Sequence, residues 1–580
     1  MASTGEEAIQ SVVDRRRRAR VAVIGAGAAG LAAARELTRE GHDAVVFEQG
    51  AELGGVWVFD ADVEDDLTGA DANRAKRVHS SVYKNLRTNL PREVMGFGSF
   101  PFTRAFTDDN RRFCGHEEVR AYLDAYADHH DIRKRVRLGT RVVAVTPTSE
   151  NTENASPRNF SESASDEDER AYLEKWGPRW CVVTEPVETT RKEEEEAPTA
   201  SNVTEPVETT RKEEEEEAPR EDGEESVRER RPSSAARSAR GETETDRASY
   251  ANETFDAVVV CNGHYSEPRV PRFPGAERWP GVQMHSHNYR EPEGPGAFSF
   301  RGKRVVVLGA AASGEDLSRE IASVAAEVIL ASRGFAPPKD ASSGDFPLDS
   351  YPRNMRRAPG ITALLPETSG VLFEDGSARR DVDVVLYATG YRVTFPFFAS
   401  FDGEEEQEEQ ASASDSESRL APRSVDNRVA PLFEHVFPPA SGPSLSFIGL
   451  PWKVVPFPQF EAQARWVARA LSGAAALPGR AEMASRAAAA EAADRGAGVA
   501  DRHAHRMGDA QFAYNDRLLA YCGEPGFPKW REAMYAATGA RKRAFPTTYR
   551  DGPDEPWSDE EALAEARAEA AALELERSSV

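Results

Sequence analysis

The chain has 580 residues, of which 39% are hydrophobic, and it carries a formal net charge of −25. This length predicts roughly two to four domains. The negative charge argues against nucleic acid or an anionic membrane as a partner, and no apolar run is long enough to span a bilayer. The four cysteines show no metal-binding or redox spacing, so we expect free thiols, no metal site and a reducing compartment. The N-terminal stretch lacks the apolar core of a signal peptide, so we expect a cytosolic protein and leave organelle targeting open.

After this polar N-terminal stretch come a strand, a glycine turn and a helix. Residues 21–24 are apolar and typical of a buried parallel strand, and Gly25, Gly27 and Gly30 follow it. Glycines at this spacing permit a tight turn, close approach of the backbone to a pyrophosphate and close packing of the helix. Glu48 ends the next strand, where a carboxylate can accept hydrogen bonds from a ribose. We therefore assign dinucleotide binding in this unit to Gly25, Gly27, Ala28, Ala29, Gly30 and Glu48.

A second unit of the same kind follows later in the chain. Gly309 and Gly314 keep the turn and the helix packing, although Ala311 stands where the middle glycine belongs. The next strand ends at Ser332 and Arg333 and not at an acid. A guanidinium there can donate two hydrogen bonds to a 2′-phosphate, whereas a carboxylate would repel it, so the site should prefer NADPH to NADH. The residues that we assign to this nucleotide are Gly309, Ala312, Ser313, Gly314, Ser332 and Arg333.

Two dinucleotide units, one ending in a glutamate and the other in an arginine, imply FAD in the first and NADPH in the second. The redox chemistry then belongs to the cofactors, and the protein positions them and controls water. A disulfide reductase would need a redox cysteine pair beside the flavin, and this chain has none at usable spacing. The sequence therefore predicts an α/β fold with two dinucleotide-binding, Rossmann-like domains.

Two polar segments interrupt this pattern. Residues from about 146 to 251 are rich in Ser, Glu and Arg, and residues 402–417 are strongly acidic. Such compositions cannot bury enough apolar surface to offset the entropy of ordering. Within the first segment, residues 172–183 contain Trp176 and Trp180 and predict one further strand. We expect the two acidic inserts to be disordered loops that leave the folded body.

Three further motifs point to one protein family. Residues 279–289 place Gly, His and Tyr at fixed spacing, residues 86–89 read Leu-Arg-Thr-Asn, and residues 388–391 read Ala-Thr-Gly-Tyr. Together with the glycine units, these motifs resemble the identifier sequence, the flavin-side segment and the interdomain turn of flavin-containing monooxygenases, with Trp279 in place of a phenylalanine. Three stretches are similar to the plant S-oxygenating (glucosinolate S-oxygenase-like) branch of that family: the turn at 309–314, residues 286–290 and residues 451–458. The resemblance covers residues 18–145, 252–400 and 427–550.

The resemblance implies roles for individual residues. Asn89 is implied to lie where the flavin meets the nicotinamide, as the catalytic residue that helps to hold the oxygenated flavin. In the identifier, Gly281 permits a turn, and His285 and Tyr289 fix the linker between the domains. For His285 a structural, hydrogen-bonded role is favoured over a catalytic one. The further residues that we assign to cofactor binding are Gly54, Trp57, Arg87, Thr88, Thr389 and Gly390.

The order of these segments along the chain predicts that the NADPH domain is inserted into the FAD domain. The ranges that we assign are an N-terminal tail (1–17), the first part of the FAD domain (18–290, with the insert at about 146–251), the NADPH domain (291–380), the second part of the FAD domain (381–547, with the insert at 402–417) and a C-terminal tail (548–580).

As an enzyme, such a protein would reduce FAD with NADPH, add O₂ at flavin C4a and use the hydroperoxide to oxygenate the sulfur or nitrogen of a small sulfide or amine. Two other functions stay open. A Baeyer–Villiger enzyme would oxygenate ketones, but the identifier of that group ends in Trp where this chain has Tyr289. An NADPH oxidase or a flavin-binding interaction protein would leave Asn89 without a use. The physiological substrate, the preference for sulfur or nitrogen, and the oligomeric state, a homodimer included, also stay open.

Overall fold

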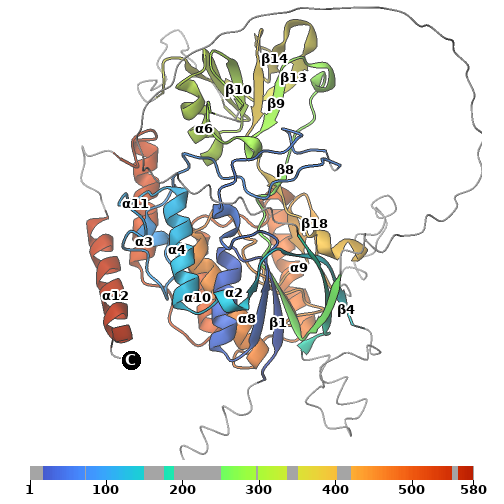
Figure 1. Ribbon diagram of the computed structural model, residues 1–580, viewed down its shortest axis with the longest axis vertical. Helices are drawn as coiled ribbons and strands as arrows, with labels where there is room; N and C mark the ends of the chain where they lie inside the picture. The colour runs from blue at the N-terminus through green and yellow to red at the C-terminus, as the bar shows by residue number, and fades with distance from the viewer. Residues whose placement is uncertain are drawn as a thin grey trace, which may run out of the picture.

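The computed structural model describes residues 17–71, 73–148, 176–187, 250–294, 298–335, 351–401, 420–551 and 559–578. The protein is an α/β fold with two parallel sheets, in two domains stacked along the longest axis (Figure 1). Most of the insert expected at 146–251 and all of the insert expected at 402–417 lie outside the described residues.

The first sheet draws its strands from distant parts of the chain. In spatial order they are β20 (Leu445–Phe447), β7 (Ala257–Val260), β1 (Arg20–Ile24), β2 (Asp43–Phe47) and β3 (Val136–Arg137). All neighbours pair in parallel. The apolar run of β1 is fully buried, as expected for a central strand covered on both faces. Because β20 comes after the second domain in sequence, the second domain is an insertion into the first.

Helices α2 (Ala28–Arg39) and α8 (Pro456–Ser472) pack together in the main core of the first domain. Buried charges join them: Glu36 of α2 and Glu461 of α8 are both 0% exposed. The Arg465 guanidinium lies 3.3 Å from the Glu36 carboxylate and 3.0 Å from that of Glu461. Because removing one partner would strand a buried charge, this network fixes one arrangement of the two helices.

The second sheet carries the second glycine turn. In spatial order its strands are β12 (Met355–Pro359), β11 (Glu327–Ser332), β10 (Arg304–Leu308), β16 (Val384–Tyr387) and β9 (Val282–His285). Helix α6 (Ala312–Ala322) packs on this sheet, and a small antiparallel sheet is formed by β13 (Ile361–Leu365), β14 (Gly370–Phe373) and β15 (Ala378–Arg379). Strands β9 and β16 flank the range 291–380, so the sheet extends beyond that range at both ends.

A third sheet, which is antiparallel, packs in the first domain. It consists of β4 (Thr140–Pro147), β5 (Trp180–Pro186) and β6 (Ala251–Phe255). Strand β5 shares residues 180–183 with the strand predicted within residues 172–183 and continues to Pro186, whereas residues 172–175 lie outside the described residues. Its Trp180 is fully buried and donates a hydrogen bond to Ser444. Two strand pairs complete the sheets: β8 (Glu267–Pro268) with β17 (Tyr391–Arg392), and β18 (Arg423–Val425) with β19 (Arg428–Ala430).

Six further α-helices of the described residues belong to the first domain. They are α3 (Arg92–Met95), α4 (His116–His129), α9 (Arg480–Gly496), α10 (Ala510–Tyr521), α11 (Trp530–Ala544) and α12 (Glu560–Ser578). Helix α12 lies along α11, where the Trp530 indole donates to Glu569 and Ala562 is buried. Helix α12 is therefore attached to the folded body.

No helix within the described ranges is long and apolar enough to cross a membrane. The four cysteines are free thiols. Burial raises the pKa of Cys114 and of Cys522 to about 12, so these thiols stay protonated at neutral pH. Among the residues whose placement is described, no group of His, Cys, Asp or Glu side chains could hold a metal ion.

Candidate active site

The first glycine turn requires glycine for steric reasons. Gly25 has φ = +100°, and a Cβ added to it would lie 2.6 Å from the carbonyl oxygen of Cys261. A Cβ on Gly30 would lie 1.9 Å from the carbonyl oxygen of Gly25. Strand β1 and helix α2 can therefore approach this closely only without these side chains, and the N-terminus of α2 points its free N–H groups at the carboxyl edge of the sheet.

A second loop closes against this turn. The Gly54 amide donates to the carbonyl oxygen of Ala26 at 2.9 Å. This bond brings Gly55 so near Gly27 that a Cβ on Gly55 would lie 2.9 Å from the Gly27 Cα. The two backbones form a cradle in which no side chain stands between Gly27 and Gly55. The Trp57 ring packs edge-on against Phe457. Such a cradle suits a pyrophosphate that binds to backbone N–H groups.

Glu48 lies at the end of β2 with its carboxylate fixed by the backbone. One oxygen accepts from the Ala26 amide at 2.8 Å and the other from the Gly50 amide at 2.8 Å. The residue is 8% exposed. Because each carboxylate oxygen has two acceptor positions, Glu48 keeps capacity to accept hydrogen bonds from a ribose.

The second glycine turn repeats this geometry. Gly309 has φ = +113°, and a Cβ added to it would lie 2.3 Å from the carbonyl oxygen of Ala388. A Cβ on Gly314 would lie 1.7 Å from the carbonyl oxygen of Gly309. Ala311 precedes α6 in an extended conformation and is exposed, as is Ser313, so the N-terminus of α6 is open to an anion.

The end of β11 presents positive charge. Arg333 is exposed, and the Ser332 hydroxyl accepts a hydrogen bond from Arg357 of β12 at 3.3 Å. The Arg357 guanidinium also bonds to Glu315 at 3.1 Å. Sequence reasoning missed Arg357, because only the parallel pairing of β11 with β12 brings it beside Ser332.

The segment of residues 86–89 lies against the first domain. The Thr88 amide donates to the Cys114 carbonyl oxygen at 2.9 Å. The Thr88 hydroxyl is buried and has no hydrogen-bond partner among the described residues, and Asn89 is exposed. The Arg87 guanidinium, in contrast, donates to the Phe113 carbonyl oxygen and to both carboxylate oxygens of Asp551. Thr88 and Asn89 are therefore available to a cofactor, whereas Arg87 is committed to protein contacts.

The histidine and the tyrosine of the identifier are both buried. His285 is 0% exposed; its Nε2 donates to the Gly390 carbonyl oxygen at 3.0 Å and its Nδ1 accepts from the His287 amide at 3.1 Å. Burial lowers the pKa of His285 to about 3, so the ring is neutral, as in a structural histidine. A Cβ on Gly281 would lie 2.4 Å from the Trp279 ring, so glycine makes room for the larger aromatic. Tyr289 is buried in the core of the second domain.

The interdomain turn that ends β16 is fixed by its neighbours. The Thr389 hydroxyl donates to the Arg269 carbonyl oxygen at 2.5 Å. Gly390 follows with φ = +81°, and its carbonyl oxygen also accepts from the Arg269 amide at 2.9 Å. The turn thus joins the segment around β8 to the identifier.

Known proteins match this chain over nearly all of its length. The family model described as flavin-binding monooxygenase-like matches residues 18–170, 226–337 and 358–525. The chain belongs to this family. The monooxygenase is 37% identical to flavin-containing monooxygenase FMO GS-OX-like 4 of Arabidopsis thaliana over 94% of this chain and 96% of that protein. It is 34% identical to flavin-containing monooxygenase FMO GS-OX4 of Arabidopsis thaliana, over 96% and 95% of the two chains.

Solved structures also match this chain. The monooxygenase superposes on S-allyl-L-cysteine S-oxygenase from Allium sativum with a TM-score of 0.71 and 34% identity, over 96% of this chain and 100% of that one. It shares its fold with Tmm from Pelagibacter sp. strain HTCC7211 at a TM-score of 0.61 and 20% identity. The expected resemblance to the plant S-oxygenating branch is confirmed.

The family description names a bound flavin, and FAD and NADPH are the cofactors that the two glycine turns lead us to expect. The residues present fit both groups: a side chain at Gly25, Gly30 or Gly55 would meet backbone atoms, the Thr88 hydroxyl is buried and unpartnered among the described residues, and the N-terminus of α6 is open.

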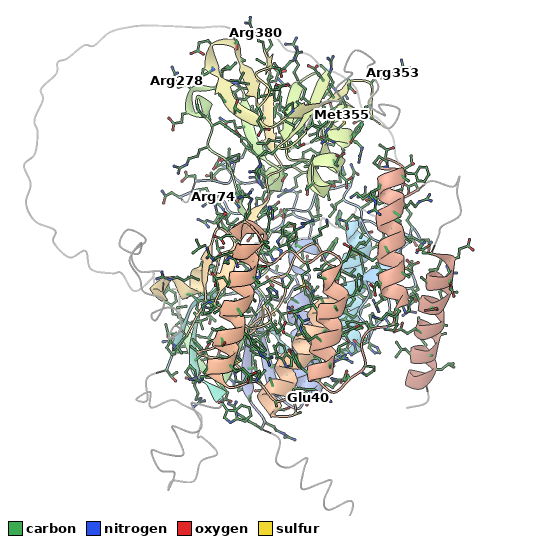
Figure 2. All side chains as sticks on the ribbon, turned by 180° about the vertical axis from the view of Figure 1, so that it is seen from behind. Glu40, Arg74, Arg278, Arg353, Met355 and Arg380 are labelled. Atoms are coloured by element: carbon green, nitrogen blue, oxygen red, sulfur yellow. The ribbon has the colours of Figure 1, made fainter. Side chains whose placement is uncertain are left out.

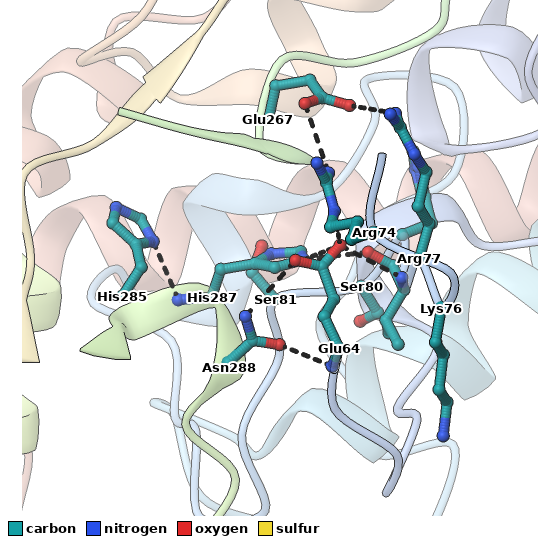
Figure 3. A network of polar contacts seen from close by, with 12 residues as sticks. Glu64, Arg74, Lys76, Arg77, Ser80, Ser81, Glu267, His285, His287 and Asn288 are labelled. Atoms are coloured by element: carbon teal, nitrogen blue, oxygen red, sulfur yellow. Dashed lines mark hydrogen bonds and ion pairs between the residues drawn. The ribbon is translucent and has the colours of Figure 1, made fainter. Parts of the chain in front are cut away.

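Sequence reasoning missed a strap that crosses the domain boundary of the monooxygenase. This interdomain strap consists of residues 60–71 and 73–78, and Figure 3 shows its polar contacts with the identifier. The Glu64 carboxylate accepts from Arg74 at 2.8 Å and from Asn288 at 3.3 Å, and the Asn288 amide oxygen accepts from the Glu64 backbone at 2.9 Å. Arg74 also reaches Glu267, and Figure 2 shows Arg74 between the two domains.

Arg290 attaches the N-terminal end of the interdomain strap. Its guanidinium donates to the carbonyl oxygens of Asp60 at 2.6 Å and of Asp62 at 2.7 Å. His287 adds a contact to the Val78 carbonyl oxygen at 2.8 Å. Arg290 and His287 thus hold the strap through backbone carbonyls, and no sequence motif marks such acceptors.

Proposed function

We propose that the monooxygenase inserts one oxygen atom of O₂ into the thioether sulfur, or the amine nitrogen, of a small molecule. The observation that carries the proposal is the 34% identity and TM-score of 0.71 with S-allyl-L-cysteine S-oxygenase over 96% of this chain. In the sulfur case, NADPH, H⁺, O₂ and the thioether give NADP⁺, water and the sulfoxide. Bound FAD supplies the activation of O₂.

In this proposal the first domain binds FAD. The backbone cradle at Gly25, Gly27 and Gly54 and the N-terminus of α2 hold the pyrophosphate, and Glu48 accepts from the ribose hydroxyls. The unpartnered Thr88 hydroxyl donates to a polar atom of the flavin.

The second domain binds NADPH. The turn from Gly309 to Gly314 holds the pyrophosphate at the N-terminus of α6. Arg333 forks onto the 2′-phosphate, which makes the site selective for NADPH over NADH. Ser332 and the neighbouring Arg357 complete the positive edge of β11.

Asn89 is exposed at the end of the flavin-side segment, where its amide can orient the nicotinamide over the flavin. His285 and Tyr289 are buried and keep the linker between the domains in place. We expect Asn89→Ala to bind both cofactors but to release peroxide in place of oxygenated product, because its amide no longer orders the reaction site.

The proposal is tested with purified, FAD-loaded protein, NADPH and labelled ¹⁸O₂. S-allyl-L-cysteine, a tertiary amine and a cyclic ketone are offered in parallel, and the product formed per NADPH consumed is measured by mass spectrometry. Labelled sulfoxide in near-equal amount to the NADPH consumed supports S-oxygenation, and an N-oxide supports the amine. A lactone from the ketone would mean a Baeyer–Villiger enzyme, and peroxide without product would mean an oxidase; either result contradicts the proposal.

A further inference from the structure

After α11 the chain returns to the boundary between the two domains. Tyr549, Arg550 and Asp551, which we name the C-terminal clasp, lie there. Tyr549 is 2% exposed and packs edge-on against Phe113, with ring centroids 5.5 Å apart. The clasp lies beyond residue 525, where the match to the family model ends, and within the range 548–580 that we assigned to a tail.

Arg550 contacts both domains with one guanidinium. Its Nε donates to the Thr88 carbonyl oxygen at 3.0 Å, on the first domain. Its two Nη atoms fork onto the Asp316 carboxylate at 3.2 and 2.6 Å, on helix α6 of the second domain. The pair is largely buried, with side-chain exposures of 16% for Arg550 and 18% for Asp316. A two-pronged guanidinium–carboxylate pair fixes orientation as well as distance.

The two ends of this bridge lie at the two nucleotide sites of the proposed function. The Thr88 carbonyl and the backbone N–H of Asn89 belong to the same peptide group, so Arg550 holds the backbone immediately before Asn89. Asp316 lies two residues after Gly314, in the helix whose N-terminus forms the second glycine turn.

A second ion pair fixes the clasp to the same segment. Asp551 accepts from both Nη atoms of Arg87 at 2.6 and 2.7 Å. Arg87 and Thr88 are therefore both held by adjacent residues of the clasp. This arrangement explains why the Arg87 guanidinium is committed to the protein.

We propose that Arg550 is a positioning residue that fixes the nucleotide turn of the second domain relative to the Thr88–Asn89 segment. The proposal rests on the proposed function, because it takes these two places to be the NADPH and flavin sites. Arg550 itself touches neither reacting group. It acts by setting the distance between them, and misplacement by about 1 Å can slow a reaction on the order of 100-fold.

The test uses the FAD-loaded full chain and the variants Arg550→Gln, Asp316→Asn and their double. The first readout is hydrogen exchange without NADPH. We expect Arg550→Gln to speed exchange about tenfold in two peptides far apart in sequence, residues 84–95 and 312–322. Arg301→Gln is the matched control, because Arg301 pairs with Glu293 at the surface of the second domain alone.

The second readout is the anaerobic rate of flavin reduction at saturating NADPH. We expect each single variant to reduce about tenfold more slowly with full flavin content, and the double variant to be no slower than the slower single, because the two residues act as one pair. The control should reduce at the wild-type rate.

Wild-type exchange and wild-type reduction in flavin-loaded Arg550→Gln would overturn the proposal. If Arg550→Gln loses its flavin, Asp316→Asn decides, because it leaves Arg550 and its bond to Thr88 in place; unchanged exchange of residues 312–322 and unchanged reduction then overturn the proposal. Neither readout uses a sulfide or amine, so a failure of the proposed oxygenation is distinguishable from a failure of the clasp.

Discussion

Replacing the last glycine of each turn by alanine should remove one cofactor at a time. In Gly314→Ala the new Cβ would lie 1.7 Å from the Gly309 carbonyl oxygen, whereas ordinary contact begins at 3.4 Å. Both the helix and the turn are backbone, so neither can yield as a side chain would, and we expect a cost at the upper end of the overpacking range, about 3 kcal/mol. Helix α6 must shift by more than about 1 Å, which corresponds to roughly a 100-fold loss in reduction by NADPH.

The matched variant is Gly30→Ala, whose Cβ would lie 1.9 Å from the Gly25 carbonyl oxygen in the other domain. We expect Gly30→Ala to purify without flavin and Gly314→Ala to purify yellow but to be reduced slowly by NADPH. Flavin content is read by absorbance and reduction by anaerobic stopped flow. Gly376→Ala is the control: its φ is +81° and a Cβ there meets nothing within 4 Å, so it should cost about 1 kcal/mol and leave both cofactors bound. Normal reduction in yellow Gly314→Ala, or loss of flavin from it, would refute the assignment of the two turns.

Three further outcomes follow from the same geometry. Arg333→Ala should raise the KM for NADPH by about 10- to 100-fold, which is equivalent to about 1.5–3 kcal/mol for a charged contact. The KM for NADH should stay nearly unchanged, and an equal effect on both KM values would contradict the 2′-phosphate assignment. Gly25→Val should yield protein without flavin, because its φ of +100° and the Cys261 carbonyl oxygen exclude a side chain, and a yellow variant would contradict that role. The pKa of His285 is about 3 in the folded protein against 6.5 for a free histidine, so the unfolded chain alone takes up this proton as the pH falls from 6.5 toward 3. The free energy of unfolding should then fall by about 1.4 kcal/mol per pH unit on this account, and urea titrations at several pH values should show a shallower slope for His285→Gln.

Local features of the site were readable from the sequence. Both glycine turns could be predicted, because the turn between a buried strand and a helix needs a residue with positive φ, and glycine adopts that conformation without strain. The acidic Glu48 at the end of β2 and the basic Arg333 at the end of β11 could also be predicted, because they belong to the same short strand–turn–helix–strand units. The strand at Trp180 was also readable, since its aromatic residues stand out from a polar background.

Contacts made across long sequence separations were not readable. Arg357 stands beside Ser332 only through strand pairing, and the interdomain strap is held largely by carbonyl oxygens that every residue carries. Arg87 illustrates the limit most clearly. Its motif predicts a cofactor contact, but its charge is bound by Asp551, separated from it by 464 residues. No local pattern predicts such a pairing.

The insertion of one domain into the other has a consequence for synthesis on the ribosome. Arg35 of α2 contacts Glu461 of α8, which is synthesised 426 residues later. His285 contacts Gly390, which follows after only 105 residues. At about 5–20 residues per second, the first helix remains without its partner for roughly 20–90 s, while the inserted sheet closes in about 5–20 s. The domain that begins second is therefore completed first, and during that interval the apolar face of α2 is open to chaperones and to other nascent chains.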